Sequence, residues 1–184
     1  MKPKTITLLF SIALSFMLYA CAGEKKQVEE LKEPTATEEV AKPKSPAASA
    51  KNTIGNTQVQ IDYYSPGVRG RNIYGGLVAY NEVWVTGAHS ATSIEFSTDV
   101  ELNGNKISKG KYALFTIPGK TDYNQHLADN YDQAKDVLRL QLVPEKLETI
   151  QEHLLYEVNS VDNNTGEISI SWAEIKVSFK IATS

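Results

Sequence analysis

From about residue 52 onward, this chain consists of short runs in which apolar and polar residues alternate, and that pattern restricts its fold more than any other feature. Val59, Ile61 and Tyr63 alternate with polar neighbours, and Ile94 and Phe96 flank Glu95 in the same way. A period of two over short runs is typical of strands with one buried face. Many such runs separated by turn residues predict an all-β domain, a single antiparallel β-sandwich over residues 52–184.

Turn chemistry and residue type predict the individual elements of this domain. The pair Asn103-Gly104 tolerates the positive φ angles of a type I′ turn, so a tight hairpin is expected there. The run 112–117 predicts a central strand that closes at Pro118-Gly119. Further strands are expected at 137–143, 154–158 and 168–172, the last facing 175–181 across a short turn, and the one expected helix is 145–152.

The N-terminus has the pattern of a secretory signal over residues 1–20. A basic start is followed by an apolar run from Ile6 to Ala20, which is too short to span a bilayer because a membrane helix needs about 20 apolar residues. The segment Leu18-Tyr19-Ala20-Cys21 resembles the lipobox of bacterial lipoproteins, in which the cysteine is acylated. We therefore expect lipidation at Cys21, the membrane as a partner, and an outer-membrane or periplasm-facing location in the cell envelope.

Cys21 is the single cysteine of the chain. The alternative interpretation is a plain signal peptide followed by an incidental cysteine, but packing explains a lone cysteine at that place poorly. If Cys21 carries lipid, no thiol remains for a disulfide, a zinc site or a nucleophile. Residues 21–51 are rich in Glu, Lys, Pro, Ala, Ser and Thr, so they predict a disordered tether between the anchor and the domain.

Charge and motif content exclude several classes of function. The chain has a formal net charge of −3, and its acidic excess lies in the predicted domain, which argues against nucleic acid as a partner. It contains no phosphate-binding loop, no dinucleotide fingerprint and no motif of a catalytic triad or carboxylate pair. The sequence therefore predicts no cofactor.

A glycine-rich stretch between the strands at 59–63 and 94–96 holds the candidate ligand-binding residues Arg69, Arg71, Thr86 and His89. The two guanidinium groups suit a carboxylate, a phosphate or a sugar, so a glycan or a small anionic ligand is the expected partner. The alternative is that the arginines pair with Asp62, Glu82 or another acid and fix the loop to the sheet. His89 has the chemistry of a general base or a metal ligand, or else it ends a strand as a hydrogen-bonded residue.

Three further sets of residues have both a functional and a structural interpretation. His126 with Asp129, and Asp129 with Asp132, have the spacing of a metal pair, although loop residues of these types usually face water. His153 is expected at the surface. Aromatic residues suit either a sugar-binding platform or the core, and their places in alternating strands favour the core: Trp84, Trp172, Phe115 and Phe179.

Five motifs in one order resemble the DUF2911 family, which is found largely in Bacteroidota and is named for its lack of a known function. The resemblance covers roughly residues 52–181, and the motifs lie at 64–71, 75–78, 83–88, 110–119 and 136–139. Two features depart from the family pattern. His89 stands where many members have asparagine, and the segment 120–126 replaces a further strand that relatives have after Gly119.

These observations together predict a lipid-anchored β-sandwich protein of the cell envelope that serves as a binding or structural module. The alternative hypothesis is an envelope hydrolase whose site lies near His89, Arg69 and Arg71. A hydrolase needs His89 in an open pocket with an acid close enough to orient its ring.

Overall fold

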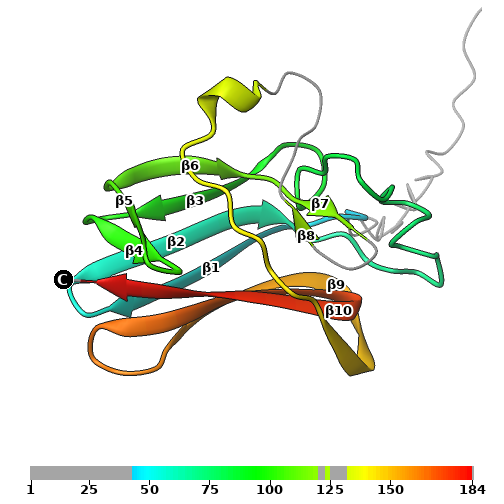
Figure 1. Ribbon diagram of the computed structural model, residues 1–184. Helices are drawn as coiled ribbons and strands as arrows, with labels where there is room; N and C mark the ends of the chain where they lie inside the picture. The colour runs from blue at the N-terminus through cyan, green and yellow to red at the C-terminus, as the bar shows by residue number, and fades with distance from the viewer. Residues whose placement is uncertain (1–42, 120–122, 125–131, 184) are drawn as a thin grey trace, which may run out of the picture. The chain divides into compact units, whose positions relative to one another are not determined.

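The computed structural model describes residues 43–119, 123–124 and 132–183. Within these residues the fold is all-β, and the one helical element is the single 3-10 turn η1, Gln133–Lys135. The first sheet has the strand order β1-β2-β3-β6, and the second has the order β5-β4-β10-β9. Figure 1 shows the two sheets facing one another, so the predicted antiparallel β-sandwich is confirmed.

The first sheet consists of β1 (Ala47–Ile54), β2 (Thr57–Tyr64), β3 (Thr92–Phe96) and β6 (Gly110–Leu114). The second consists of β4 (Val100–Leu102), β5 (Asn105–Ile107), β9 (Glu145–Ser160) and β10 (Thr165–Thr183). A two-residue pair, β7 (Ile117–Pro118) and β8 (Tyr123–Asn124), lies beside them. Every strand pairing is antiparallel.

The core lies between the two sheets and is filled by alternate residues of their strands. On β2, Val59, Ile61 and Tyr63 are buried while their neighbours are more exposed, as the sequence pattern predicts. On β9, in the second sheet, Leu154, Tyr156 and Val158 are buried and alternate with more exposed neighbours. The predicted turn at Asn103-Gly104 is also confirmed, since both residues have positive φ, 47° and 81°, between β4 and β5.

Several predicted elements need correction. Residues 145–152 form the first half of β9 rather than a helix, because β10 offers them backbone partners: Ala173 pairs with Gln151 and Ile175 with Lys146. Residues 168–172 and 175–181 do not face one another, because they belong to the one strand β10, whose pairing is irregular around Ala173. Tertiary pairing here overrides local preference.

Two boundaries and one strand position also differ from the sequence expectation. β1 begins at Ala47, so the last residues of the predicted tether 21–51 belong to the sandwich. The strand predicted at 112–117 ends at Leu114 and forms β6, which is an edge strand rather than a central one. Residues 120–122, and with them most of the segment that replaces the family's further strand, lie outside the described residues.

The segment 137–143, expected as a strand, is extended but forms no continuous ladder with either sheet. We call residues 136–143 the strap; Figure 1 shows it running from η1 across the space between the sheets to the start of β9. Its side chains alternate as in a strand: Leu138, Leu140 and Leu142 turn inward against the core, and Val137 and Val143 are exposed. Leu142 takes part in an isolated β-bridge, but the strap forms no ladder in the described residues, so side-chain packing produces most of the period of two.

The two lateral edges of the sandwich are closed in different ways. At one edge β1 meets β9, where the Asn52 side-chain amide donates a hydrogen bond of 2.8 Å to the Val158 carbonyl. At the other edge β6 and β5 do not pair with each other, and the strap crosses the gap. We call this second side the open edge.

Two adjacent residues of the strap allow a direct test of which side chains pack against the core. Leu142 is 5% exposed and Val143 is 78% exposed, although the two are adjacent. Leu142→Ala is expected to lower the free energy of unfolding by about 2 to 5 kcal/mol, because it leaves a cavity in the core. Val143→Ala is the matched control and should change it by less than about 0.5 kcal/mol. Urea denaturation of both variants measures the difference, and equal effects would contradict the observed orientation of the strap.

Candidate binding site

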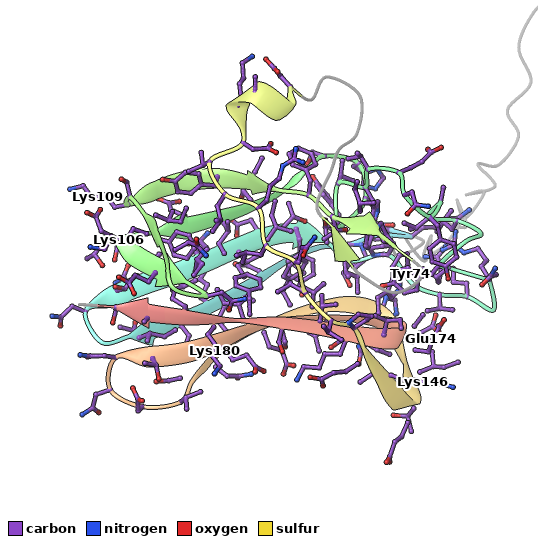
Figure 2. The ribbon with its side chains drawn as sticks, in the orientation of Figure 1. Tyr74, Lys106, Lys109, Lys146, Glu174 and Lys180 are labelled. Carbon is purple, nitrogen blue, oxygen red and sulfur yellow. The ribbon has the colours of Figure 1, made fainter. Side chains whose placement is uncertain are left out.

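The predicted site residues lie in the long loop that connects β2 to β3, residues 65–91. Figure 1 shows this loop at the end of the sandwich where β7 and β8 lie, and Figure 2 shows its residue Tyr74 at the end opposite Lys106 and Lys109. Four non-glycine residues of the loop have positive φ: Arg69 (53°), Asn81 (61°), Thr86 (50°) and His89 (65°). Such residues persist only where the surrounding structure holds them in place.

The first part of the loop runs along β9 and is held there by its backbone. Val68 donates its N–H to the Glu152 carbonyl at 2.7 Å, and Leu154 donates to the Pro66 carbonyl at 3.0 Å. The Ser65 hydroxyl donates to the Leu154 carbonyl at 2.7 Å. Through these bonds the first part of the loop pairs with β9 along its backbone. This part of the loop is therefore fixed to the sandwich.

Arg69 and Arg71 are exposed, and the guanidinium group of each donates hydrogen bonds to backbone carbonyls rather than to acids. Arg71 donates from Nε to the Val68 carbonyl at 3.0 Å and from Nη2 to the Gly67 carbonyl. Arg69 donates from Nη2 to the Lys44 carbonyl, and its backbone N–H donates to Glu152 Oε1 at 2.9 Å. Neither guanidinium group pairs with Asp62, Glu82 or another acid that the structure describes, so the acid pairing that the sequence suggested is not observed and backbone carbonyls take its place.

Thr86 is buried at 1% exposure and lies at the centre of a polar cluster. Its carbonyl accepts hydrogen bonds from the Thr92 hydroxyl at 2.8 Å and from the Tyr156 hydroxyl at 2.9 Å. Its own hydroxyl donates to Thr116 Oγ1 at 3.0 Å. Burial raises the pKa of Tyr156, so that its hydroxyl stays protonated and remains a donor. Thr86 therefore has a structural role and cannot reach a ligand.

His89 is exposed and lies edge-on to the Tyr64 ring, with ring centroids 5.0 Å apart and an interplanar angle of 85°. No hydrogen bond or ion pair joins its ring to any other residue that the structure describes. The acid that a hydrolytic base requires is thus not in contact with His89. The geometry gives the hydrolase hypothesis no support, and none of the four candidate residues lines the hollow at the open edge or the hollow on the outer face of the first sheet.

The remaining candidates divide between surface and core. His153 is exposed, as predicted. Trp172 is buried and stacks on the half-buried Trp84 at 5.3 Å, and Phe179 is buried in the same core, so the aromatic residues do not form an exposed platform. His126 and Asp129 lie outside the described residues, while Asp132 pairs with Lys135 at 3.5 Å. Within residues 43–119, 123–124 and 132–183, no group of three acids, histidines or cysteines is placed to hold a metal ion, and no helix is long and apolar enough to cross a membrane.

One hollow in the described part of the chain lies at the open edge, and none of the four predicted residues lines it. This open-edge cavity has a volume of about 400 Å³. Core side chains from both sheets line it together with the inner face of the strap: Ile94, Phe96, Leu102, Ile107, Leu114, Phe115, Leu138, Leu140 and Phe179. Its size falls in the range of small-molecule sites, which are mostly apolar with a few polar groups.

Charged residues gather at the mouth of the open-edge cavity. Lys111, Lys135 and Arg139 supply three cations, and Asp132 and Asp136 supply two acids. Arg139 pairs with Asp136 within the strap, and Lys111 of β6 reaches across β3 to lie 3.8 Å from Asp62 of β2. Sequence reasoning missed this site because its lining comes from five strands and the strap, and only the alternation of Leu138, Leu140 and Leu142 signalled an inward-facing set.

Comparison with known proteins agrees with the sequence resemblance. The profile of a family described as "Protein of unknown function (DUF2911)" matches residues 45–181, which is most of the chain. The chain belongs to the DUF2911 family. The match begins two residues before β1, so the DUF2911 region and the sandwich coincide. No curated protein and no solved structure shows significant similarity to it.

The polar cluster around Thr86 is expected to contribute measurably to stability. Thr86→Val keeps the shape of the side chain but leaves the buried Thr116 hydroxyl without its donor, so the free energy of unfolding should fall by about 1 to 3 kcal/mol. Tyr156→Phe removes one of two donors to the Thr86 carbonyl and should cost about 0.5 to 1.5 kcal/mol.

Thr53→Val, at an exposed position of β1, is the control and should stay within about 0.5 kcal/mol of the original protein. Chemical denaturation of the three variants provides the comparison. The structural role assigned to Thr86 is wrong if Thr86→Val is as stable as the control.

Proposed function

We propose that this DUF2911 protein is a lipid-anchored binding module of the cell envelope, and that its sandwich holds a small molecule with an apolar body and an anionic end in the open-edge cavity. The observation that supports the ligand site is the cavity itself, with about 400 Å³ of space lined by core side chains. In a well-packed sandwich this volume would be filled, because protein interiors have few voids larger than a water molecule.

The chemistry of the lining supports the choice of ligand. An apolar body would cover the part-exposed lining side chains Leu138, Leu140 and Phe115, and burial of apolar surface is favourable by roughly 25 cal/mol per Å². Each of the three cations has an acid within 4 Å, Lys111 with Asp62, Lys135 with Asp132 and Arg139 with Asp136, so an anionic end would bind by replacing one of these acids as the partner. Exposed ion pairs such as Lys135–Asp132 are weak, so a ligand carboxylate or phosphate can exchange partners with them at little cost.

The proposed location rests on the N-terminal sequence. A basic start, an apolar run and Cys21 directly after Ala20 support export and acylation at the cell membrane. Several acyl chains at one residue give stable anchoring, because each buried methylene contributes about 0.8 kcal/mol and a single chain is only marginal. The tether then holds the sandwich at a distance from the bilayer, where the open edge can exchange ligand.

The anchor is tested by Cys21→Ser expressed in the native type of host. Cells grown with a radiolabelled fatty acid should label the unaltered chain and not the variant, and the variant should leave the membrane fraction, since Cys21 is the one thiol available for acylation. Thr35→Ser, in the tether, is the control and should label normally. Label retained by the Cys21→Ser chain would refute lipidation at this residue.

The ligand site is tested with cis-parinaric acid, a fluorescent fatty acid with a carboxylate end. The full chain in mild detergent should bind it, and Leu138→Trp should weaken binding at least tenfold, because the larger ring fills the cavity from the strap. Val143→Trp makes a comparable enlargement on the exposed face of the strap and should bind as the original does. The methyl ester of the probe should bind several-fold more weakly than the acid, because it lacks the anionic end.

Thermal unfolding of the two tryptophan variants establishes that both are folded. The proposal fails if the unaltered chain does not bind the probe, or if both variants bind it equally well.

A further inference from the structure

A second hollow lies on the opposite, outward face of the first sheet, and its position follows from strand register. On β2 the residues Val59, Ile61 and Tyr63 point into the core, so Asp62 and Tyr64 point outward. Ser49 of β1 pairs with Asp62, and Asp62 pairs with Ser93 of β3. These three side chains therefore form one row across three strands on the outer face.

This outer-face groove has a volume of about 460 Å³, and its lining combines polar groups with a larger share of apolar surface. Serines and alanines from β1, from β3 and from the end of the long loop form most of it. Neither the Ser90 nor the Ser93 hydroxyl makes a hydrogen bond to another described side chain or backbone group. Both hydroxyls can therefore donate to a ligand and accept from it.

An aromatic pair forms the end of the groove nearest the long loop. Tyr64 lines the groove and is half-buried, and the exposed His89 packs edge-on against it at 5.0 Å. The pair fixes the Tyr64 ring in one orientation. Aromatic rings with one accessible face bind apolar C–H surfaces next to polar groups.

Asp62 is a fixed acceptor in the middle of the row. The Gln60 amide donates to both of its oxygens, at 2.9 and 2.7 Å, and the Lys111 Nζ lies 3.8 Å from one of them. Partial burial raises the pKa of Asp62, but hydrogen bonds from Ser49 and Gln60 and the nearby Lys111 and Lys51 outweigh it, so the pKa lies below its ordinary value. Asp62 is thus a carboxylate at neutral pH.

The charges around the groove favour a neutral ligand. Asp62 disfavours an anion, while Lys51 and Lys111 beside it compensate its charge and disfavour a cation. A long apolar ligand would leave the serine hydroxyls and the carboxylate unsatisfied, at a cost of about 1 to 3 kcal/mol for each buried group. The remaining class is a neutral molecule with many hydroxyl groups and an apolar C–H face.

We propose that the outer-face groove binds a neutral saccharide, with Asp62 accepting hydrogen bonds from neighbouring sugar hydroxyls and Tyr64 packing against a C–H face of the ring. Ser93 adds a hydrogen bond from β3, and Ser90 adds another from the end of the long loop. This site is separate from the open-edge cavity and does not depend on the ligand proposed there. It also gives His89 a role, as the residue that positions the Tyr64 ring.

The test uses saturation-transfer NMR on the full chain with three neutral disaccharides: cellobiose, maltose and di-N-acetylchitobiose. At least one should receive saturation from the protein. Asp62→Asn should weaken its binding at least fivefold, and Tyr64→Ala at least tenfold. Glu95→Gln, on the same outer face but outside the groove, should bind as the original does.

A second variant keeps the test decisive if Tyr64→Ala is unstable. Ser49→Tyr fills the groove from an exposed position of the edge strand β1, where tyrosine is well tolerated, and it should abolish saturation transfer without lowering the melting temperature. The proposal is overturned if none of the three disaccharides receives saturation. It is equally overturned if binding persists unchanged in both Asp62→Asn and Ser49→Tyr.

Discussion

The carbonyl oxygen of Thr86 ties the long loop to both sheets of the sandwich at once. It accepts one buried hydrogen bond from Thr92, at the start of β3 in the first sheet, and another from Tyr156, in the middle of β9 in the second. A buried carbonyl left without a partner costs about 1 to 3 kcal/mol, so the loop cannot leave this position cheaply. The positive φ of Thr86, unusual for a β-branched residue, is the strained conformation that aims the carbonyl at both donors.

This arrangement explains why the glycine-rich loop is structural although its composition resembles that of a binding loop. Its arginines close the loop on itself and on the Lys44 carbonyl, and its backbone extends the edge of β9. One end of the sandwich is thereby sealed, and the β1–β9 side is closed as well. The open edge, where the strap covers the core in the described part of the chain, offers a place where a ligand can reach apolar side chains.

Local sequence patterns predicted those parts of the fold that local chemistry determines. The alternation on β2 and β3 and the Asn103-Gly104 turn depend on neighbouring residues, and all three were predicted correctly. The first half of β9 was expected as a helix because its residues suit one, and only pairing with Ala173 and Ile175, more than twenty residues away, makes it a strand. The strap has the period of a strand but is not a strand of either sheet, a distinction that periodicity alone does not make.

The candidate sites also divide into features that residue type can suggest and features that only the folded chain creates. Arg69, Arg71 and Thr86 were selected by residue type, but their partners are carbonyls that only the folded chain brings near them. The open-edge cavity and the outer-face groove consist of ordinary leucines, serines and alanines from distant strands, so residue type could not reveal either one. Of the four predicted binding residues, His89 lies beside the outer-face groove, through its contact with Tyr64.

The most direct test of the open-edge cavity as the binding site is an NMR titration of the isotopically labelled chain with dodecanoate, an anion with an apolar chain. The account predicts chemical-shift changes that cluster at the open edge, on Leu114, Leu138, Leu140 and Phe179, while the signals of Thr86, Thr92 and Tyr156 stay in place. Shift changes centred instead on Arg69 and Arg71, with the open edge unaffected, would contradict it and would return the binding site to the long loop.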